Sequence, residues 1–263
     1  MLSYLAVCTS ALLAAGLTMY SGFGLGTVLL PVFALFLPVE AAVLATALVH
    51  GANNVFKVAL LGRGADRGVV LRFGLPAVAA VVLGAAALGW IATTEFRFSL
   101  ALGDRTLVSV TPVKAIVGLL MIVFALFELL PRFQRLAFDR RYLPLGGVLS
   151  GFFGGLSGHQ GALRSAFLAK AGLDTPAFVG SNAVIGLLVD LTRVAVYLAL
   201  FATVGAGLAG SGAWPLIATG ALSAFTGVLI GRRYLHKVTM RSVQILVGAF
   251  LLGVGAALVL GLI

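Results

Sequence analysis

Two short glycine-broken stretches hold the residues of this chain that are best suited to bind a ligand. They are Ser21-Gly22-Phe23-Gly24-Leu25-Gly26 and Ser157-Gly158-His159-Gln160-Gly161. Glycine is unfavourable in a helix interior, so each stretch predicts a break in an otherwise apolar helix. A helix that starts just after such a break offers free N–H groups and a positive dipole end, which together attract anions. The residues expected to bind an anion at these two tips are Ser21, Gly22, Phe23, Gly24, Ser157, Gly158, His159 and Gln160. The alternative is that the glycines only allow close packing of membrane helices.

Two further segments each carry a stripe of polar residues at helical spacing. The first stripe consists of Thr46, His50, Asn53 or Asn54, and Lys57, and the second of Asn182, Asp190, Arg193 and Tyr197. Ionisable groups inside a membrane usually face protein or a water-filled cavity. We predict that Thr46, Asn54, Lys57, Asn182 and Arg193 contribute to the binding site, and that Asp190, His159 and His50 are candidates for proton coupling.

Each of these charged residues also has a structural explanation. Lys57 could extend its ammonium group to the membrane surface. Arg193 could simply pair with Asp190 three residues earlier. The histidines could be hydrogen-bonded packing residues, and Arg164 could point either to the anion or to the cytoplasmic mouth. Glu128 lies at a span end, where an interfacial position is expected.

The composition places these residues in a membrane protein. Of the 263 residues, 61% are hydrophobic and only 10% are charged, which leaves no sequence for a soluble enzyme domain. The net charge of +10 falls in short loops between spans, so membrane topology explains it without a nucleic-acid partner. Cys8 is the single cysteine, and the sequence contains no metal, cofactor or catalytic motif.

The apolar segments divide the chain into two similar halves. Six clean spans are predicted at 41–61, 74–93, 112–130, 177–203, 213–231 and 242–262, separated by links such as the polar stretch 94–111. An offset of 136 positions aligns Ser21 with Ser157, Gly22 with Gly158, Thr46 with Asn182, Asn54 with Asp190 and Lys57 with Arg193. We therefore expect a first membrane repeat at 1–131, a basic cytoplasmic linker at 132–141 and a second repeat at 142–263.

The charge of the loops predicts how the broken segments lie. If all basic loops are cytoplasmic, 142–170 must enter the membrane and return, because a full crossing would put the next basic loop outside. Applied to 2–37, the same reasoning gives each half one hairpin and three crossings, so the halves are inverted relative to each other. The predicted fold is an all-α polytopic membrane protein with two inverted repeats, and the alternative is eight full spans, four in each half. Interrupted segments at matching positions in such repeats point to the site of a secondary transporter.

The glycine motifs resemble those of a known family, the TauE/SafE sulfite exporters. The likeness lies in 21–26 with Pro31, in 45–57, and in Gly151-Phe152-Phe153-Gly154-Gly155-Leu156-Ser157-Gly158 followed by Gly180-Ser181-Asn182. The resemblance implies movement of sulfite, thiosulfate, sulfonates or small carboxylates across the bacterial inner membrane, without a cofactor. His159-Gln160 and Arg164 depart from the usual family pattern and add polar or positive character, so the substrate could differ.

These observations together predict a secondary transporter of a small anion, plausibly sulfite, a sulfonate or another organic anion. The expected location is the bacterial inner (plasma) membrane, which the chain crosses several times. A homodimer is one assembly that the sequence allows. An uncoupled anion channel is the first alternative, and an intramembrane enzyme or assembly partner is the second. Direction, coupling ion and the identity of the anion are not specified by the sequence.

Overall fold

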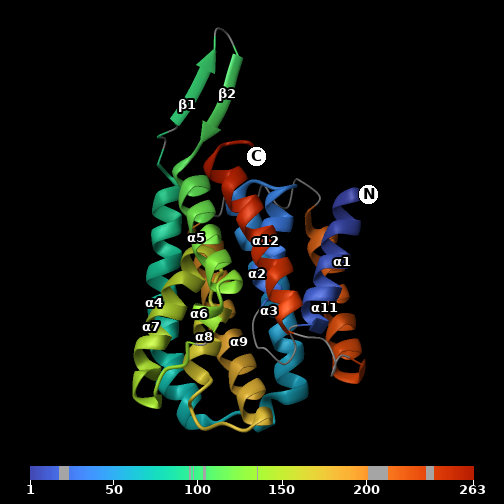
Figure 1. Cartoon of the computed structure of the whole chain (residues 1–263), viewed down its shortest axis with the longest axis vertical. Helices are drawn as coiled ribbons and strands as arrows, with labels where there is room; N and C mark the ends of the chain where they lie inside the picture. Colours follow the sequence, from blue (N-terminus) through green and yellow to red (C-terminus); the bar gives the residue numbers. More distant parts are fainter. Residues whose placement is uncertain are drawn as a thin grey trace.

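The computed structural model describes residues 1–17, 24–94, 96, 98–102, 105–134, 136–200, 213–234 and 240–263. In this part of the chain the structure is a bundle of helices with one β-hairpin that projects beyond it (Figure 1). The helices are α1 (Leu2–Leu17), α2 (Leu25–Ala34), α3 (Val39–Leu61), α4 (Arg67–Ala92), α5 (Pro112–Leu129), α6 (Pro131–Gln134), α7 (Leu143–Ser157), α8 (Gly161–Leu168), α9 (Thr175–Leu200), α11 (Ala213–Tyr234) and α12 (Met240–Val259). The strands are β1 (Phe98–Leu102) and β2 (Arg105–Val110), and short 3-10 turns cover Gly62–Gly64 and Arg140–Tyr142.

Several of these helices have the length and composition of membrane spans. Among the described residues, five apolar segments meet both criteria, and they lie in α3, α4, α5, α9 and α11. These five correspond to predicted spans, and the sixth prediction, 242–262, falls on α12. The body of the protein is therefore helical and polytopic, as the sequence predicted.

The second broken segment forms a helical hairpin. Helix α7 has 15 residues and α8 has eight, and they are joined through Gly158, whose φ of +83° favours glycine. A helix of 15 residues is about 22 Å long, which is shorter than a bilayer core of about 30 Å. The prediction that 142–170 breaks at its glycine motif is confirmed.

The first broken segment is described only on either side of its turn. Helix α1 has 16 residues and α2 has ten, and α2 begins after Gly24, whose φ is +120°. Ser21, Gly22 and Phe23, which were predicted to form the first tip, lie outside the described residues.

The polar link predicted at 94–111 contains β structure that the sequence reading missed. Strands β1 and β2 pair antiparallel, with Phe98 opposite Val110, and a bulge lies between Leu100 and Ala101. Figure 1 shows this hairpin extending past the helix ends, on the side where both chain termini lie. Hydrophobic residues alternate along 98–102 before Gly103-Asp104, which is a recognisable hairpin signal. The expectation of an all-helical chain therefore applies to the bundle and not to this link.

Close backbone contacts hold the second hairpin against α4. Helices α4 and α7 run parallel, and small residues of α7 recur every four positions along their contact. A Cβ atom at these positions would overlap a backbone carbonyl oxygen of α4, and the pairs are Gly147 with Phe73, Gly151 with Ala77, and Gly155 with Val81. Only glycine permits such an approach, which is a common way for membrane helices to pack.

Helices α1 and α11 pack in the same manner. They also run parallel, and a Cβ at Gly227 would overlap the carbonyl oxygen of Leu12, while a Cβ at Gly231 would lie 2.5 Å from the carbonyl oxygen of Gly16. Helix α4 precedes the basic linker in the chain but packs on α7 after it, and α11 likewise packs on α1. The two sequence halves are therefore interlaced in space.

Helix α4 also runs parallel to α9, with Gly74 near Leu188 and Gly89 near Leu200, whereas two further long contacts are antiparallel. Helix α3 crosses α9, and the Asn54 side chain meets Asp190, which lies 136 positions later in the chain. Helix α5 packs on α12, where a Cβ at Gly118 would lie 2.8 Å from the Gly255 carbonyl oxygen and a Cβ at Gly255 would lie 2.8 Å from that of Gly118.

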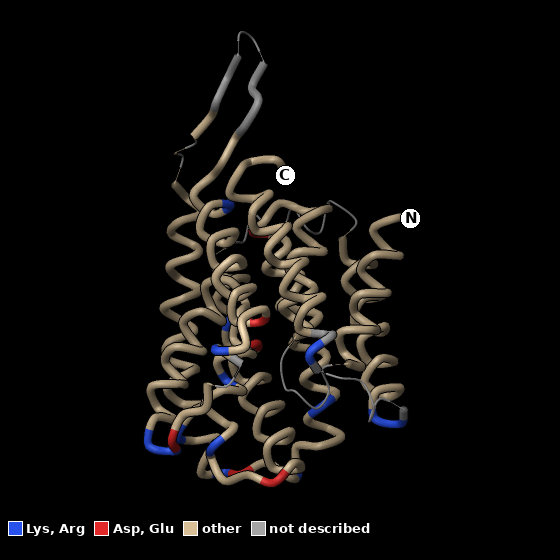
Figure 2. The backbone as a smooth tube through the Cα atoms, viewed as in Figure 1, with Lys and Arg blue, Asp and Glu red and all other residues tan. Residues whose placement is uncertain are grey.

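Charged residues mark one end of the bundle. In Figure 2, backbone positions of Lys and Arg gather at the end of the bundle opposite to both termini. Asp66 and Arg140, from two loops at this end, form an ion pair of 3.9 Å, with the two side chains 35% and 46% exposed. Such an exposed pair contributes little to stability, but basic loops on one side agree with the positive-inside rule.

Candidate functional site

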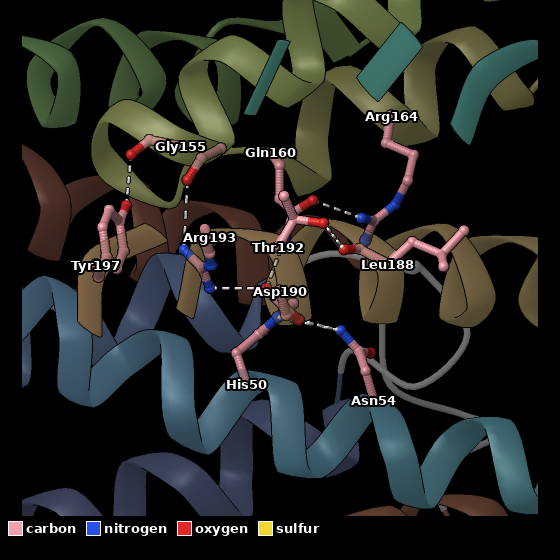
Figure 3. Close-up of polar contacts among 11 residues, drawn as sticks. His50, Asn54, Gly155, Gln160, Arg164, Leu188, Asp190, Thr192, Arg193 and Tyr197 are labelled. Carbon is pink, nitrogen blue, oxygen red and sulfur yellow. Dashed lines mark hydrogen bonds and ion pairs between the residues drawn. The ribbon is translucent and has the colours of Figure 1, made fainter. Parts of the chain in front are cut away.

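A buried polar cluster lies between α3, the α7–α8 hairpin and α9. Figure 3 shows His50 and Asn54 reaching from α3, and Gln160 and Arg164 from the hairpin, toward Asp190 on α9. Polar side chains are rare in this composition, yet these five are all at most 8% exposed. Their position inside apolar helices requires internal partners, because lipid supplies none.

Asp190 is the hub of the cluster. One carboxylate oxygen, Oδ2, lies 2.6 Å from His50 Nδ1 and accepts a hydrogen bond of 2.6 Å from Asn54 Nδ2. The other oxygen, Oδ1, accepts a hydrogen bond of 3.0 Å from Gln160 Nε2 and lies 2.8 Å from Arg193 Nη2. Four side chains on three structural elements thus hold one carboxylate, which explains how a buried charge is tolerated.

Arg164 extends the cluster toward the start of α9. Its Nε donates to Asn182 Oδ1 at 2.5 Å, and its Nη1 donates to Gln160 Oε1 at 3.0 Å. Asn182 in turn donates from Nδ2 to Ser165 Oγ at 3.4 Å. Because Arg164 is 1% exposed, its guanidinium points into the cluster and not to the cytoplasmic mouth.

The start of α2 meets the second tip beside this cluster. A Cβ at Gly26 would lie 3.3 Å from His50 Cδ2 and 3.7 Å from the carbonyl oxygen of Gly158. A Cβ at Gly158 would in turn lie 2.7 Å from Arg193 Nη1. The first turn of α2, the second tip, His50 and Arg193 therefore converge on one place.

Some polar atoms near the second tip have no hydrogen-bond partner. Arg193 Nη1 donates to Gly154 O at 3.4 Å, whereas its Nε has no hydrogen bond and Nη2 has only the ion pair with Asp190. His159 Nδ1 lies 3.0 Å from Ser157 Oγ, and its ring stacks on Phe124, but Nε2 is buried without a partner. A buried polar group without a partner is unfavourable, so each of these atoms marks a place where a ligand would be stabilised.

The stripe on α3 is only partly incorporated into the cluster. Thr46 Oγ1 and both amide atoms of Asn53 are buried without hydrogen-bond partners. Lys57 is only 8% exposed, which argues against an ammonium group that reaches the surface. Glu128, at the end of its predicted span in the last turn of α5, is 3% exposed and lines a cavity of about 700 Å³ between α5 and the second hairpin.

The predicted residues that the structure brings into contact come mainly from the second half. They are His50, Asn54, Ser157, Gly158, His159, Gln160, Asn182, Asp190 and Arg193. The Asp190–Arg193 pair, which the sequence offered as a structural explanation for Arg193, is present. Tyr197, which the sequence places in the polar stripe but not among the binding residues, donates its hydroxyl to Gly155 O. The four-residue spacing of Arg193 and Tyr197 was the available signal for this residue. The sequence reading missed the hydroxyl of Ser150, which donates to Gln160 O at 3.0 Å.

The charges of the cluster do not balance. Asp190 is its one carboxylate among the described residues, while Arg164, Arg193 and the nearby Lys57 are cationic side chains. Arg164 repels both Lys57 and Arg193 electrostatically. Within the described part of the chain, no three His, Cys, Asp or Glu side chains come together as a metal site would require. The arrangement is suited to an anion.

Comparison with known proteins assigns the chain to a family. No curated protein matches the chain. A family model described as sulfite exporter TauE/SafE matches residues 7–258, which is nearly the whole length. This match includes both broken segments, the polar stripes of α3 and α9, and all the helices that cross the bundle. The chain therefore belongs to the TauE/SafE sulfite exporter family.

Proposed function

We propose that this membrane transporter binds a small anion such as sulfite or a sulfonate between its two glycine-broken tips. The observation that carries the proposal is the excess of positive charge in the polar cluster, where Asp190 is the one carboxylate among the described residues. Arg164 and Arg193 bring two positive charges close to one carboxylate, so an anion that contacts either guanidinium would be stabilised there. The unpartnered Arg193 Nε and His159 Nε2 are further contacts for its oxygen atoms.

The helix starts at the tips add neutral donors to this charge. The first N–H groups of α2 and α8 have no carbonyl partner within their own helices, and both helices begin at glycine-broken backbone. Their positive dipole ends would favour the same anion. Ser21, Gly22 and Phe23 are proposed to complete the first tip, opposite Ser157, Gly158 and Gln160.

We also propose that the halves are inverted repeats, 1–131 and 142–263. One support is the α3–α9 crossing, where the offset of 136 maps the contact His50–Asp190 onto the contact Asn54–Gly186. A second support is the reciprocal contact of Gly118 with Gly255, which are 137 positions apart by subtraction of their numbers. Both lie where a two-fold axis in the membrane plane would pass. Hairpins that enter from opposite sides would then let the site open alternately to either side.

Transport can be tested directly in sealed vesicles. The protein is reconstituted into proteoliposomes, and uptake of labelled sulfite is measured with thiosulfate, taurine and lactate as unlabelled competitors. Saturable uptake that one competitor reduces supports the proposed function. Absence of uptake and of competition for every anion would contradict it.

The same preparation separates the alternatives. A channel would give an anion current that does not saturate and is insensitive to an imposed pH gradient. An enzyme built on Ser157 and His159 would form product in detergent, where no sealed compartment exists. Expression in a bacterium, with fractionation of the two membranes, tests the proposed inner-membrane location.

A further inference from the structure

The contact between His50 and Asp190 contains a proton. His50 Nδ1 and Asp190 Oδ2 are 2.6 Å apart, and without a proton both atoms are acceptors that would repel each other. Either the imidazole donates to the carboxylate or a protonated carboxylic acid donates to the imidazole. Asn54 Nδ2 lies 2.6 Å from the same oxygen and 3.1 Å from the same nitrogen, so it holds the two groups together. The pair is a buried place for a proton in the middle of α3 and α9.

Arg193 connects this pair to the anion site. Its Nη2 lies 2.8 Å from Asp190 Oδ1, while its Nη1 lies beside Gly158 at the second tip. One guanidinium thus faces both the carboxylate and the place where the anion is proposed to bind. An anion there would attract Arg193 away from Asp190 and would add negative charge close to the carboxylate. Both effects favour a second proton on the His50–Asp190 pair.

We infer that the His50–Asp190 pair is a proton-binding site and that it takes up one proton when an anion binds to Arg193. This inference rests on the proposed function and names its coupling ion. The ring of His50 also faces the first turn of α2 at Gly26, so a protonated His50 would present positive charge at the same junction. Proton and anion therefore bind together and cross the membrane in the same direction.

The surrounding groups determine the sign of the coupling. From α8 and α9, the charged or titratable side chains that face the pair are Arg164, Arg193 and Tyr197. Lys57 on α3 lies close enough to Arg164 to be repelled by it. His159 at the second tip is also close enough to Arg193 to sense its charge. Among these, Arg193 is the one in direct contact with the pair and also beside the tip, so it transmits the effect of the anion. His159 is left to contact the anion and is not needed as a proton carrier.

Proton uptake on binding is the direct test. Purified protein in weakly buffered detergent solution is mixed with methanesulfonate or thiosulfate, whose charges are constant between pH 5 and 9, and a pH indicator reports proton exchange. The wild type is expected to take up about one proton per bound anion in the pH range where the pair titrates. By linkage, the dissociation constant should rise up to about tenfold per pH unit in that range.

Two variants separate the coupling from anion binding. Asp190→Asn should bind the anion with an affinity independent of pH, and His50→Gln should show reduced proton uptake. Arg140→Gln is the control, because it removes an exposed charge outside the cluster, keeps the pair and should keep the pH dependence. Binding without proton uptake in the wild type would overturn this inference and leave the anion site standing. If neither anion binds at any pH, both the proposed anion site and the proposed proton coupling are contradicted.

Discussion

The two halves of the bundle are alike in their backbone packing and unlike in their polar side chains. The parallel pairs α4–α7 and α1–α11 both bring a glycine against a carbonyl oxygen, at Gly155 in one and at Gly227 in the other. The polar stripes differ. On α9, Asn182, Asp190, Arg193 and Tyr197 all have partners, whereas α3 leaves Thr46 and Asn53 without hydrogen bonds.

This difference suggests a division of roles between the halves. Most polar groups of α9 have partners on the second hairpin or on α3, and these bonds fix the positions of the three elements. Those of α3 that have no partner remain able to bind something else. A duplicated scaffold can therefore keep its packing in both copies while only one copy completes a polar network.

The largest effect is expected from the shared packing. Gly155→Val and Gly227→Val each place a side chain onto a backbone carbonyl, and backbone cannot move aside without separating the helices. Both variants should lose folded protein, as measured by size-exclusion chromatography of detergent extracts. Gly253→Ala is the control, since a Cβ there meets nothing within 4 Å. A normal elution profile for one of the two valine variants would show that the scaffolds are less alike than the contacts indicate.

Arg193→Gln should have the next largest effect. It leaves Asp190 buried beside one fewer cation, which reduces the free energy of unfolding by about 3–5 kcal/mol. The double variant Asp190→Asn/Arg193→Gln removes both charges and should recover most of that stability but none of the saturable anion uptake. Thermal unfolding and vesicle uptake measure the two properties separately. Full uptake by the double variant would show that Asp190 and Arg193 have only a structural role.

Neighbouring asparagines on α3 provide a sharper test of the difference. Asn54→Leu removes a hydrogen bond to a carboxylate, so the free energy of unfolding should fall by about 1.5–3 kcal/mol. Asn53→Leu removes two unpartnered groups and should raise it by about 1–3 kcal/mol. If Asn53 binds the anion, this more stable variant should still transport poorly. Unchanged uptake would mean that the unpartnered amide has no role in binding.

Thr46→Val should have the smallest effect. A hydrogen bond from a hydroxyl to an anion contributes about 1.5 kcal/mol at the low end, so its loss would weaken anion binding by about tenfold. Thr219→Val is the matched control, because that hydroxyl donates to Pro215 O within its own helix, on α11. Equal anion affinities of the two variants in titrations would show that Thr46 does not contact the anion.

Much of the helical body can be predicted from the sequence because its signals are local. Apolar length predicts the spans, and Gly158 within an apolar segment predicts the break between α7 and α8. The register of polar residues aligned Asn54 with Asp190, and these two residues are in contact. Contacts between distant segments carry no such signal. The direction of Arg164 depends on Asn182 at the start of α9, and the burial of Glu128 depends on how α5 meets the second hairpin.

The interlaced packing of α4 has a consequence for how the protein is made. Synthesis proceeds at about 5–20 residues per second, so α4 waits several seconds in the membrane before α7 emerges from the ribosome. Throughout that interval the backbone carbonyls of Phe73, Ala77 and Val81 in α4 lack the glycines of α7 that pack against them in the folded protein. Neither half is a complete assembly unit by itself, and a chain cut within 132–141 should regain its shape only when both pieces are synthesised in the same membrane.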